Sequence, residues 1–281
     1  MTFRTLIDVD SLQGLLGKPQ VAILDCRFDL INPEAGRQAY LSGHIPGARH
    51  ADLNRDLSAP ITAGSGRHPL PAPKAFADRL GQLGVGNDTQ VVAYDDVNGS
   101  FAARAWWMLR WLGHTSVAVL DGGFKAWTAK GGALRSGAID AASAHFSPRI
   151  DSRAWLSTDD VVAALRNPEA VLVDARSPER FAGTVEPIDP VAGHVPGAVN
   201  HPFTSNLDAA GRFLTAAELE RRWVERLAGK QPRNLVAMCG SGVTACHNLL
   251  ALEVAGLTGA KLYAGSWSEW IRDPRRPVAR S

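Results

Sequence analysis

Short apolar runs rich in β-branched residues alternate along this chain with longer segments whose apolar residues recur at helical spacing. Continuous apolar runs of this kind are typical of strands buried on both faces. Their alternation with helices predicts an α/β fold in which parallel sheets are covered by helices on both faces. The predicted strands are residues 21–24, 91–94, 117–120, 171–173, 235–238 and 261–263, and the predicted helices are residues 74–83, 101–112, 158–166, 216–227 and 243–255.

The chain also repeats itself over a long period, because four sequence blocks recur in the same order. A repeat of this length indicates two copies of a whole domain rather than a solenoid. We therefore expect an N-terminal domain over residues 1–137, a linker over residues 138–152 and a C-terminal domain over residues 153–281. Within the first copy, the Gly- and Pro-rich residues 60–69 are predicted to form a surface loop. The blocks are Gly-His-Ile-Pro-Gly-Ala at 43–48 and Gly-His-Val-Pro-Gly-Ala at 193–198, residues 21–27 and 171–176, residues 91–95 and 235–239, and residues 119–127 and 262–270.

Composition and charge narrow the possible classes of function. The 281 residues are 45% hydrophobic and 21% charged, which excludes a disordered chain, a collagen-like fibre and a disulfide-stapled miniprotein. The net charge of +2 offers no concentrated basic surface for nucleic acid, and no apolar run approaches the length that spans a bilayer. The N-terminus lacks the apolar core of a secretion signal, so we expect a cytoplasmic protein without nucleic-acid or membrane partners.

The three cysteines, Cys26, Cys239 and Cys246, match neither a disulfide framework nor a zinc site. Cys239 is the first residue after a predicted strand, and Gly240 and Gly242 allow the chain to curl around it. Successive N–H groups of that loop would stabilise an anion, helped by the positive end of the following helix. This pattern predicts a reactive thiolate at Cys239, whereas Cys246 is expected to pack in the core.

The loop Cys-Gly-Ser-Gly-Val-Thr-Ala at 239–245 and the duplicated Gly-His-Ile/Val-Pro-Gly-Ala block resemble the rhodanese (sulfurtransferase) family over nearly the whole chain. The loop is most similar to that of the 3-mercaptopyruvate sulfurtransferases, since thiosulfate sulfurtransferases carry Arg and Lys after the cysteine. The resemblance implies two tandem rhodanese-like domains and a ping-pong reaction. In it, Cys239 takes sulfur from 3-mercaptopyruvate as a persulfide, releases pyruvate, and passes the sulfur to a thiol, cyanide or a thioredoxin-like reductant. No cofactor and no metal are expected.

The resemblance also implies roles for other side chains. Ser241 would help to move the donor's proton together with a histidine of the first copy, and His44 is the position that matches. An alternative role for His44 and His194 is that of a turn histidine bonded to local backbone, because both copies carry one. Glu34 lies near the place of the family's acidic partner for that histidine.

Arg180 matches the arginine that binds the donor's anionic group, and a guanidinium suits a carboxylate because it forms two parallel hydrogen bonds. An ungapped count places Asp189 where relatives carry a second arginine, so donor preference stays open. Arg176 is instead predicted to pair with a carboxylate of its own domain, since Arg27 repeats it in the first copy. The loop residues expected to bind the transferred group are Gly240, Gly242, Val243 and Thr244.

In the first copy, Asp95 occupies the position of the nucleophile. Because a carboxylate cannot accept sulfur, we expect this copy to be catalytically silent and to supply one wall of a cleft between the domains.

The same loop also bears on other possible functions. A thiosulfate sulfurtransferase stays open as the alternative enzyme, although positions 240 and 241 carry no cation for a compact dianion. A non-enzymatic sulfur carrier or partner-binding module also stays open. A phosphatase is excluded because Ala245 stands where Cys-x5-Arg chemistry requires arginine. A thiol–disulfide oxidoreductase is disfavoured by the spacing of Cys239 and Cys246.

Overall fold

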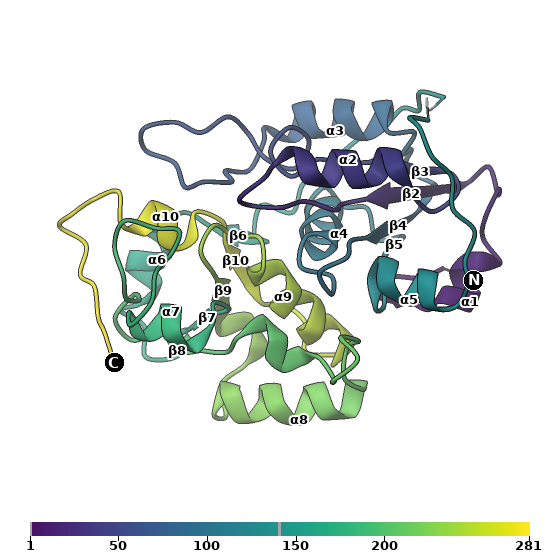
Figure 1. The fold of residues 1–281 in the computed structure, drawn as a ribbon. Helices are drawn as coiled ribbons and strands as arrows, with labels where there is room; N and C mark the ends of the chain where they lie inside the picture. The colour runs from purple at the N-terminus through teal and green to yellow at the C-terminus, as the bar shows by residue number, and fades with distance from the viewer. Residues whose placement is uncertain (1, 140–141) are drawn as a thin grey trace. The chain divides into compact units, whose positions relative to one another are not determined.

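The computed structural model describes residues 2–139 and 142–281 and divides the chain into two compact units. The first comprises Met1–Ala59, Leu70–Asp151 and Ala210–Arg212, and the second comprises Pro60–Pro69, Ser152–Ala209 and Phe213–Ser281. Each unit contains one five-stranded parallel sheet flanked by helices (Figure 1). Two residues of the predicted linker, 140 and 141, lie outside the described residues.

The first sheet has the strand order β1-β5-β4-β2-β3, and each neighbouring pair is parallel. This order places β4, which precedes Asp95, in the middle of the sheet. One face of the sheet presents Ile23 and Val92 to α1 and α5, where Leu12 and Trp127 complete an apolar cluster. The elements are β1 (Leu6–Ile7), α1 (Val9–Gln13), β2 (Val21–Asp25), α2 (Glu34–Ser42), β3 (Ala48–His50), α3 (Pro73–Gln82), β4 (Gln90–Tyr94), α4 (Ala102–Trp111), β5 (Val117–Leu120) and α5 (Gly123–Ala129).

The second sheet repeats this topology with the order β6-β10-β9-β7-β8. Its central strand β9 packs Val236 and Met238 against Trp267 and Trp270 of α10. In Figure 1, α8 and α9 lie on the opposite side of this sheet from α6 and α10. The elements are β6 (Trp155–Leu156), α6 (Thr158–Ala164), β7 (Val171–Asp174), α7 (Pro178–Ala182), β8 (Val199–Asn200), α8 (Ala216–Leu227), β9 (Leu235–Met238), α9 (Ala245–Val254), β10 (Lys261–Tyr263) and α10 (Ser266–Trp270), with 3-10 turns at Phe203–Asn206 and Pro232–Asn234.

Local sequence explains the helices that the pattern predicts. Helix α8 begins after Thr215, whose hydroxyl accepts a hydrogen bond from the Glu218 N–H at 3.3 Å, and it buries Leu219, Trp223 and Leu227 on one face. These three residues recur every four positions, which brings them to the same side of a helix.

The predicted α/β class with two parallel sheets flanked by helices is confirmed, and every predicted strand and helix is present within two residues of its predicted ends. The pattern does not predict the edge strands β1, β3, β6 and β8 or the helices α1, α2, α5, α7 and α10. The edge strands have only two or three residues each, too few to show a period. Among the described helices, none is long and apolar enough to cross a membrane.

Candidate active site

Cys239 lies at the carboxyl end of β9, the central strand of the second sheet, and begins the loop that leads to α9. The residue is only 2% exposed. Its N–H donates to Ser266 Oγ at 3.1 Å, and its carbonyl accepts from the Trp267 N–H at 3.0 Å. The Ser268 N–H donates to the carbonyl of Gly240 at 2.9 Å. The first turn of α10 therefore holds the backbone of the cysteine in place.

Gly242 allows the loop to turn, as the sequence predicts. Its φ of +77° lies in the left-handed region, where residues with a Cβ are strained. A Cβ at this position would also lie 2.4 Å from the carbonyl oxygen of Ala264, which belongs to the backbone and cannot move aside freely. Position 242 therefore requires glycine for conformation and for space.

The backbone of the cysteine loop offers N–H groups to an anion. In the described part of the chain, no residue accepts a hydrogen bond from the N–H of Gly240, Ser241, Val243 or Thr244. Helix α9 follows directly from Ala245, so the positive end of its backbone dipole adds to these donors. The loop is therefore suited to stabilise a thiolate or another anion on the residue that precedes it.

The equivalent loop of the first unit, which follows β4, surrounds the carboxylate of Asp95. Asp95 follows β4 as Cys239 follows β9, and its carboxylate accepts four backbone hydrogen bonds. Oδ1 accepts from the N–H groups two and four residues further on, at 2.9 and 2.8 Å, and Oδ2 accepts from those six and seven residues further on, both at 2.8 Å. Burial raises the pKa of Asp95 even though these donors favour its charged form. The equivalent loop thus encloses a carboxylate with convergent N–H groups.

The other two cysteines lie in different surroundings. Cys246 is fully buried, as predicted, and its Sγ contacts the carbonyl of Gly242 at 3.3 Å. Burial and the nearby charge of Asp95 raise the pKa of the Cys26 thiol well above its usual value, which keeps that thiol protonated. In the part of the chain that the structure describes, no group of three or more His, Cys, Asp or Glu side chains is placed to hold a metal ion.

His68, which the sequence patterns did not single out, contacts Ser241. Its Nδ1 lies 2.7 Å from Ser241 Oγ, and both residues are buried. This contact connects an ionisable ring to the hydroxyl two residues after Cys239. His68 comes from residues 60–69, the segment predicted as a surface loop. This segment belongs to the second unit, and Gly66 and His68 within it are buried.

Close backbone contacts hold this segment against α10. The Gly66 N–H donates to Glu269 Oε2 at 3.3 Å, and the Arg67 N–H donates to Ser268 Oγ at 3.1 Å. A Cβ on Gly66 would lie 2.6 Å from the carbonyl oxygen of Gly265, so the two backbones approach too closely for any side chain at that position. A charged and a titratable residue side by side within a ten-residue Gly- and Pro-rich loop were the available sequence signal for this site.

His44 has a local role in the described structure. Its Nδ1 lies 2.8 Å from the carbonyl oxygen of Tyr40, and the two rings stack with centroids 4.2 Å apart. His194 repeats both contacts with Phe181, at 2.8 Å to the carbonyl oxygen and 3.8 Å between ring centroids. These contacts match the turn-histidine alternative for both positions.

The acidic residue expected beside the histidine also has a different contact. Glu34 lies at the start of α2, is half exposed and forms an ion pair with Arg55. The described contacts therefore bring His68, rather than His44 and Glu34, to Ser241. Local sequence could not reveal this, because the contact joins residues 173 positions apart.

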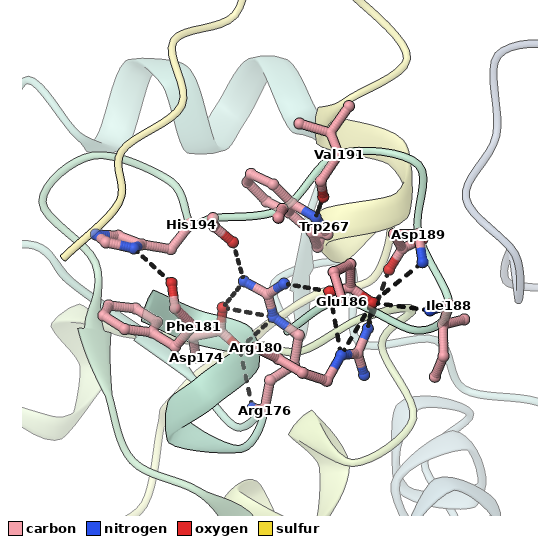
Figure 2. Close-up of polar contacts among 12 residues, drawn as sticks. Asp174, Arg176, Arg180, Phe181, Glu186, Ile188, Asp189, Val191, His194 and Trp267 are labelled. Carbon is pink, nitrogen blue, oxygen red and sulfur yellow. Dashed lines mark hydrogen bonds and ion pairs between the residues drawn. The ribbon is translucent and has the colours of Figure 1, made fainter. Parts of the chain in front are cut away.

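Arg180 lies on α7 and is held by two carboxylates (Figure 2). Its Nε donates to both oxygens of Glu186 at 3.1 Å, its Nη2 donates to Glu186 Oε1 at 2.7 Å, and Nη2 lies 3.2 Å from Asp189 Oδ2. Burial opposes the ionisation of Glu186, but the Arg180 hydrogen bonds and the N–H groups of Ile188 and Asp189 outweigh it and lower the pKa of Glu186. Glu186 thus fixes the orientation of the guanidinium.

Asp189 bridges this arginine to a second one. Its Oδ2 faces Arg180, while its Oδ1 forms an ion pair with Nη1 of Arg67. Burial raises the pKa of Asp189 although both arginines favour its charged form. A Cβ on Gly240 would lie 2.8 Å from Arg67 Nη2 and 3.5 Å from Arg180 Nη2. Both guanidiniums therefore end beside the residue that follows Cys239.

The ion pair predicted for Arg176 is confirmed. Its Nε lies 3.1 and 3.0 Å from the two oxygens of Asp174, and its Nη2 donates to Asp174 Oδ2 at 2.7 Å and to the carbonyl of Gly193 at 2.8 Å. Arg27 forms the same pair with Asp25 in the first unit. Figure 2 shows the Arg176 guanidinium directed at Asp174. Arg176 is therefore a structural residue of the fold.

Comparisons with known proteins agree with this picture. The model of the "Rhodanese-like domain" family matches residues 8–130 and 157–273. A Pseudomonas aeruginosa protein named probable 3-mercaptopyruvate sulfurtransferase is 50% identical over 281 residues, which cover 99% of each chain. A thiosulfate sulfurtransferase of Gallus gallus is 37% identical over 253 residues, covering 89% of this chain and 86% of that protein. The crystal structure of SseA from Escherichia coli, described as a 3-mercaptopyruvate sulfurtransferase fold, superposes with a TM-score of 0.81 and 34% identity, covering 95% of this chain and 100% of the other.

Proposed function

This chain belongs to the rhodanese-like domain family, and from that premise we propose that it transfers sulfur from 3-mercaptopyruvate to a thiol or cyanide through a persulfide on Cys239. The chain is a sulfurtransferase, as are the relatives that match it almost end to end. The observation that carries the finer proposal is the position of Cys239, a buried thiol at the end of β9 whose loop directs N–H groups to no described acceptor. Ser241 lies on the same loop and contacts His68 of residues 60–69.

In the first half of the reaction, the Cys239 thiolate attacks the thiol sulfur of 3-mercaptopyruvate. A sulfur–sulfur bond forms, the donor's carbon–sulfur bond breaks, and its electron pair goes to the carbon as the enolate of pyruvate. The proton of the donor thiol passes to the Ser241–His68 pair and then to that carbon, which completes pyruvate. The pair is placed for this transfer because a hydroxyl in a 2.7 Å hydrogen bond to an imidazole can accept one proton while passing on another.

In the second half, the outer sulfur of the persulfide is attacked by the acceptor. A thiolate acceptor forms a new persulfide, cyanide forms thiocyanate, and in both cases the electron pair of the sulfur–sulfur bond returns to Cys239 as the thiolate. The loop N–H groups and the start of α9 support the negative charge on Cys239 in the free enzyme and on the persulfide. The same donors therefore serve both halves of the cycle.

The donor is proposed from the charges beside Gly240. A monoanionic donor with a carboxylate needs one guanidinium edge, and Arg180 directs Nη1 and Nη2 to within 3.7 and 3.5 Å of a Cβ at that position. Glu186 and Asp189 compensate the charge of the arginines there, which disfavours a compact dianion. Thiosulfate stays the alternative donor, and the name of the Gallus gallus relative supports keeping it.

The first copy is proposed to be catalytically silent. Asp95 stands at the position of the nucleophile, and four backbone N–H groups already bind its carboxylate. The anion that the first loop stabilises is therefore part of the chain, and no thiol occupies that place.

The test is donor-dependent sulfur addition to Cys239. Wild type, Cys239→Ser and the control Cys246→Ser are each treated with 3-mercaptopyruvate, and intact-mass and peptide analysis locate added sulfur. We expect one added sulfur on Cys239 in wild type and in Cys246→Ser, and no added sulfur and no turnover in Cys239→Ser at an unchanged melting temperature. Turnover that survives in Cys239→Ser, with sulfur on Cys26 or Cys246, would overturn the assignment.

Donor preference is measured as kcat/KM for 3-mercaptopyruvate and for thiosulfate with one common acceptor. We expect 3-mercaptopyruvate to be the better donor. A larger kcat/KM for thiosulfate would establish the alternative enzyme. A persulfide that forms without any turnover to thiols or cyanide would instead establish a sulfur carrier.

A further inference from the structure

One buried carboxylate of the chain itself lies between two guanidiniums beside the cysteine loop. Asp189 directs Oδ1 to Arg67 Nη1 and Oδ2 to Arg180 Nη2. Its side chain is 3% exposed, whereas those of Arg67 and Arg180 are 23% and 17% exposed. Each oxygen of the Asp189 carboxylate therefore faces a different guanidinium. Asp189 therefore demonstrates that these two arginines can share one carboxylate.

Both guanidiniums keep N–H groups for a further acceptor. Arg180 uses Nε and Nη2 for Glu186 and Asp189, while no described residue accepts from its Nη1. Arg67 uses Nη1 for Asp189, and its buried Nε has no hydrogen-bond partner among the described residues. A buried donor without an acceptor is costly, so an acceptor that reaches the Arg67 guanidinium would reduce that cost.

Three guanidinium nitrogens of the two arginines lie close to position 240. A Cβ on Gly240 would lie 2.8 Å from Arg67 Nη2, 3.5 Å from Arg180 Nη2 and 3.7 Å from Arg180 Nη1. Gly240 directly follows Cys239, so an anionic group held there lies close to the attacking sulfur. A side chain at position 240 would displace the Arg67 guanidinium, so glycine here allows both arginines to reach the residue that follows Cys239.

The charges of the two arginines and of Glu186 and Asp189 cancel in two pairs. Glu186 compensates Arg180, and Asp189 compensates Arg67, so the arginines attract a donor mainly through directed hydrogen bonds rather than through net charge. Of the two carboxylates, Glu186 is the more firmly ionised, because its pKa is lowered whereas burial raises the pKa of Asp189. Asp189 is therefore the partner that yields more easily to an incoming carboxylate.

We propose that Arg67 is a second donor-binding guanidinium and that Asp189 competes with the donor's carboxylate for it. This inference rests on the proposed function and names the groups that select the donor. The donor's carboxylate binds the Gly240-facing edges of Arg67 and Arg180. Asp189 keeps the net charge of the site near zero, which favours a monoanionic donor over a dianion. Arg67 and Asp189 thus set donor specificity together, from two segments far apart in the sequence.

The test uses Arg67→Ala, Arg67→Lys, Asp189→Asn and the double variant Arg67→Ala/Asp189→Asn, each assayed with 3-mercaptopyruvate and thiosulfate. Arg275→Ala is the matched control, because it removes one positive charge from an exposed side chain whose ion pair among the described residues is with Asp273. The readouts are kcat, KM and the single-turnover rate of persulfide formation. Thermal unfolding shows whether each variant is folded. If Arg67→Ala does not fold, the kinetics of Arg67→Lys and Asp189→Asn decide the test.

We expect Arg67→Ala to lower kcat/KM for 3-mercaptopyruvate by about ten- to a hundredfold, mainly through KM. Arg67→Lys keeps the charge but loses the fork, so it should recover only part of this loss. Asp189→Asn should lower KM for both donors and raise the ratio of thiosulfate to 3-mercaptopyruvate kcat/KM. The double variant restores the net charge without the second guanidinium and should stay slow with 3-mercaptopyruvate. Arg275→Ala should match wild type.

Two results would overturn the inference while leaving the proposed function intact. One is wild-type kinetics in Arg67→Lys and Asp189→Asn, with persulfide still forming on Cys239. The other is full recovery of 3-mercaptopyruvate kcat/KM in the double variant, which would mean that Arg67 only neutralises Asp189. A wild-type protein that forms no persulfide with either donor would instead overturn the proposed function itself.

Discussion

Replacing Arg180 with alanine should weaken both the fold and donor binding, and the structure allows the two effects to be separated. Arg180 directs three of its four hydrogen bonds to Glu186, whose side chain is 3% exposed. Removing one partner of a buried ion pair leaves an uncompensated charge and costs about 3–5 kcal/mol of unfolding free energy. Glu186 would keep two backbone N–H donors and the Arg176 contact at 3.4 Å. We therefore expect the lower end, about 3 kcal/mol.

The second variant, Arg180→Ala/Glu186→Gln, removes the buried charge together with its partner. Most of the lost unfolding free energy should return, because a neutral amide costs much less to bury than a carboxylate without its cation. Donor binding should not return, since the guanidinium is still missing. We expect kcat/KM for 3-mercaptopyruvate to stay about ten- to a hundredfold below wild type in both variants. Urea unfolding and steady-state kinetics on the same preparations measure the two quantities.

Either of two outcomes would refute this reasoning. If Arg180→Ala changed the unfolding free energy by less than about 0.5 kcal/mol, the Arg180–Glu186 pair would not be the buried interaction that the contacts indicate. If the double variant recovered both stability and kcat/KM, Arg180 would serve only to neutralise Glu186 and would not contact the donor. Arg180→Lys gives an intermediate case, because lysine keeps the charge but cannot form the forked contact.

Three further changes test the loop that follows Cys239 and the equivalent loop that follows Asp95. His68→Gln should lower the rate of persulfide formation by about 10²- to 10⁴-fold with little change in KM, because it removes the titratable partner of Ser241. Since burial raises the folded-state pKa of Asp95, the folded protein retains a proton that the unfolded chain releases above about pH 4. The contribution of Asp95 to stability should therefore fall as the pH rises from about 4 through its folded pKa, so the difference in unfolding free energy between wild type and Asp95→Asn should change over this range. Gly242→Ala should lose about 3 kcal/mol or more, against about 1–2 kcal/mol for Gly256→Ala, which has a similar φ of +75° but no atom within 4 Å of the new Cβ.

Each of these expectations has a contradicting result. Wild-type persulfide formation in His68→Gln would show that the pair does not move the donor's proton. A difference in unfolding free energy between wild type and Asp95→Asn that is the same at pH 4 and pH 7 would mean that the Asp95 pKa is not raised on folding. Equal losses in the two glycine variants would mean that the contact with Ala264 relaxes without cost.

The sequence alone was sufficient for the fold class and for the position of the proposed nucleophile in it. Buried parallel strands must be apolar on both faces, so their runs are continuous and the inner strands of both sheets are visible in the residue order. The tandem repeat then indicated two sheets of the same topology. Cys239 was predictable because a residue that directly follows a central strand lies at the carboxyl edge of the sheet, where ligands bind.

The tertiary structure was needed to determine what surrounds that nucleophile. His68 and Arg67 come from a loop without periodicity, and their contacts with Ser241 and Asp189 join residues 173 and 122 positions apart. The sequence placed Asp189 where a second arginine was expected, and only the structure shows that the loop brings Arg67 into an ion pair with it. Apolar burial repeats with the period of a strand or helix and so leaves a pattern in the sequence. A polar contact between distant segments depends on where one loop meets another, and no local pattern records it.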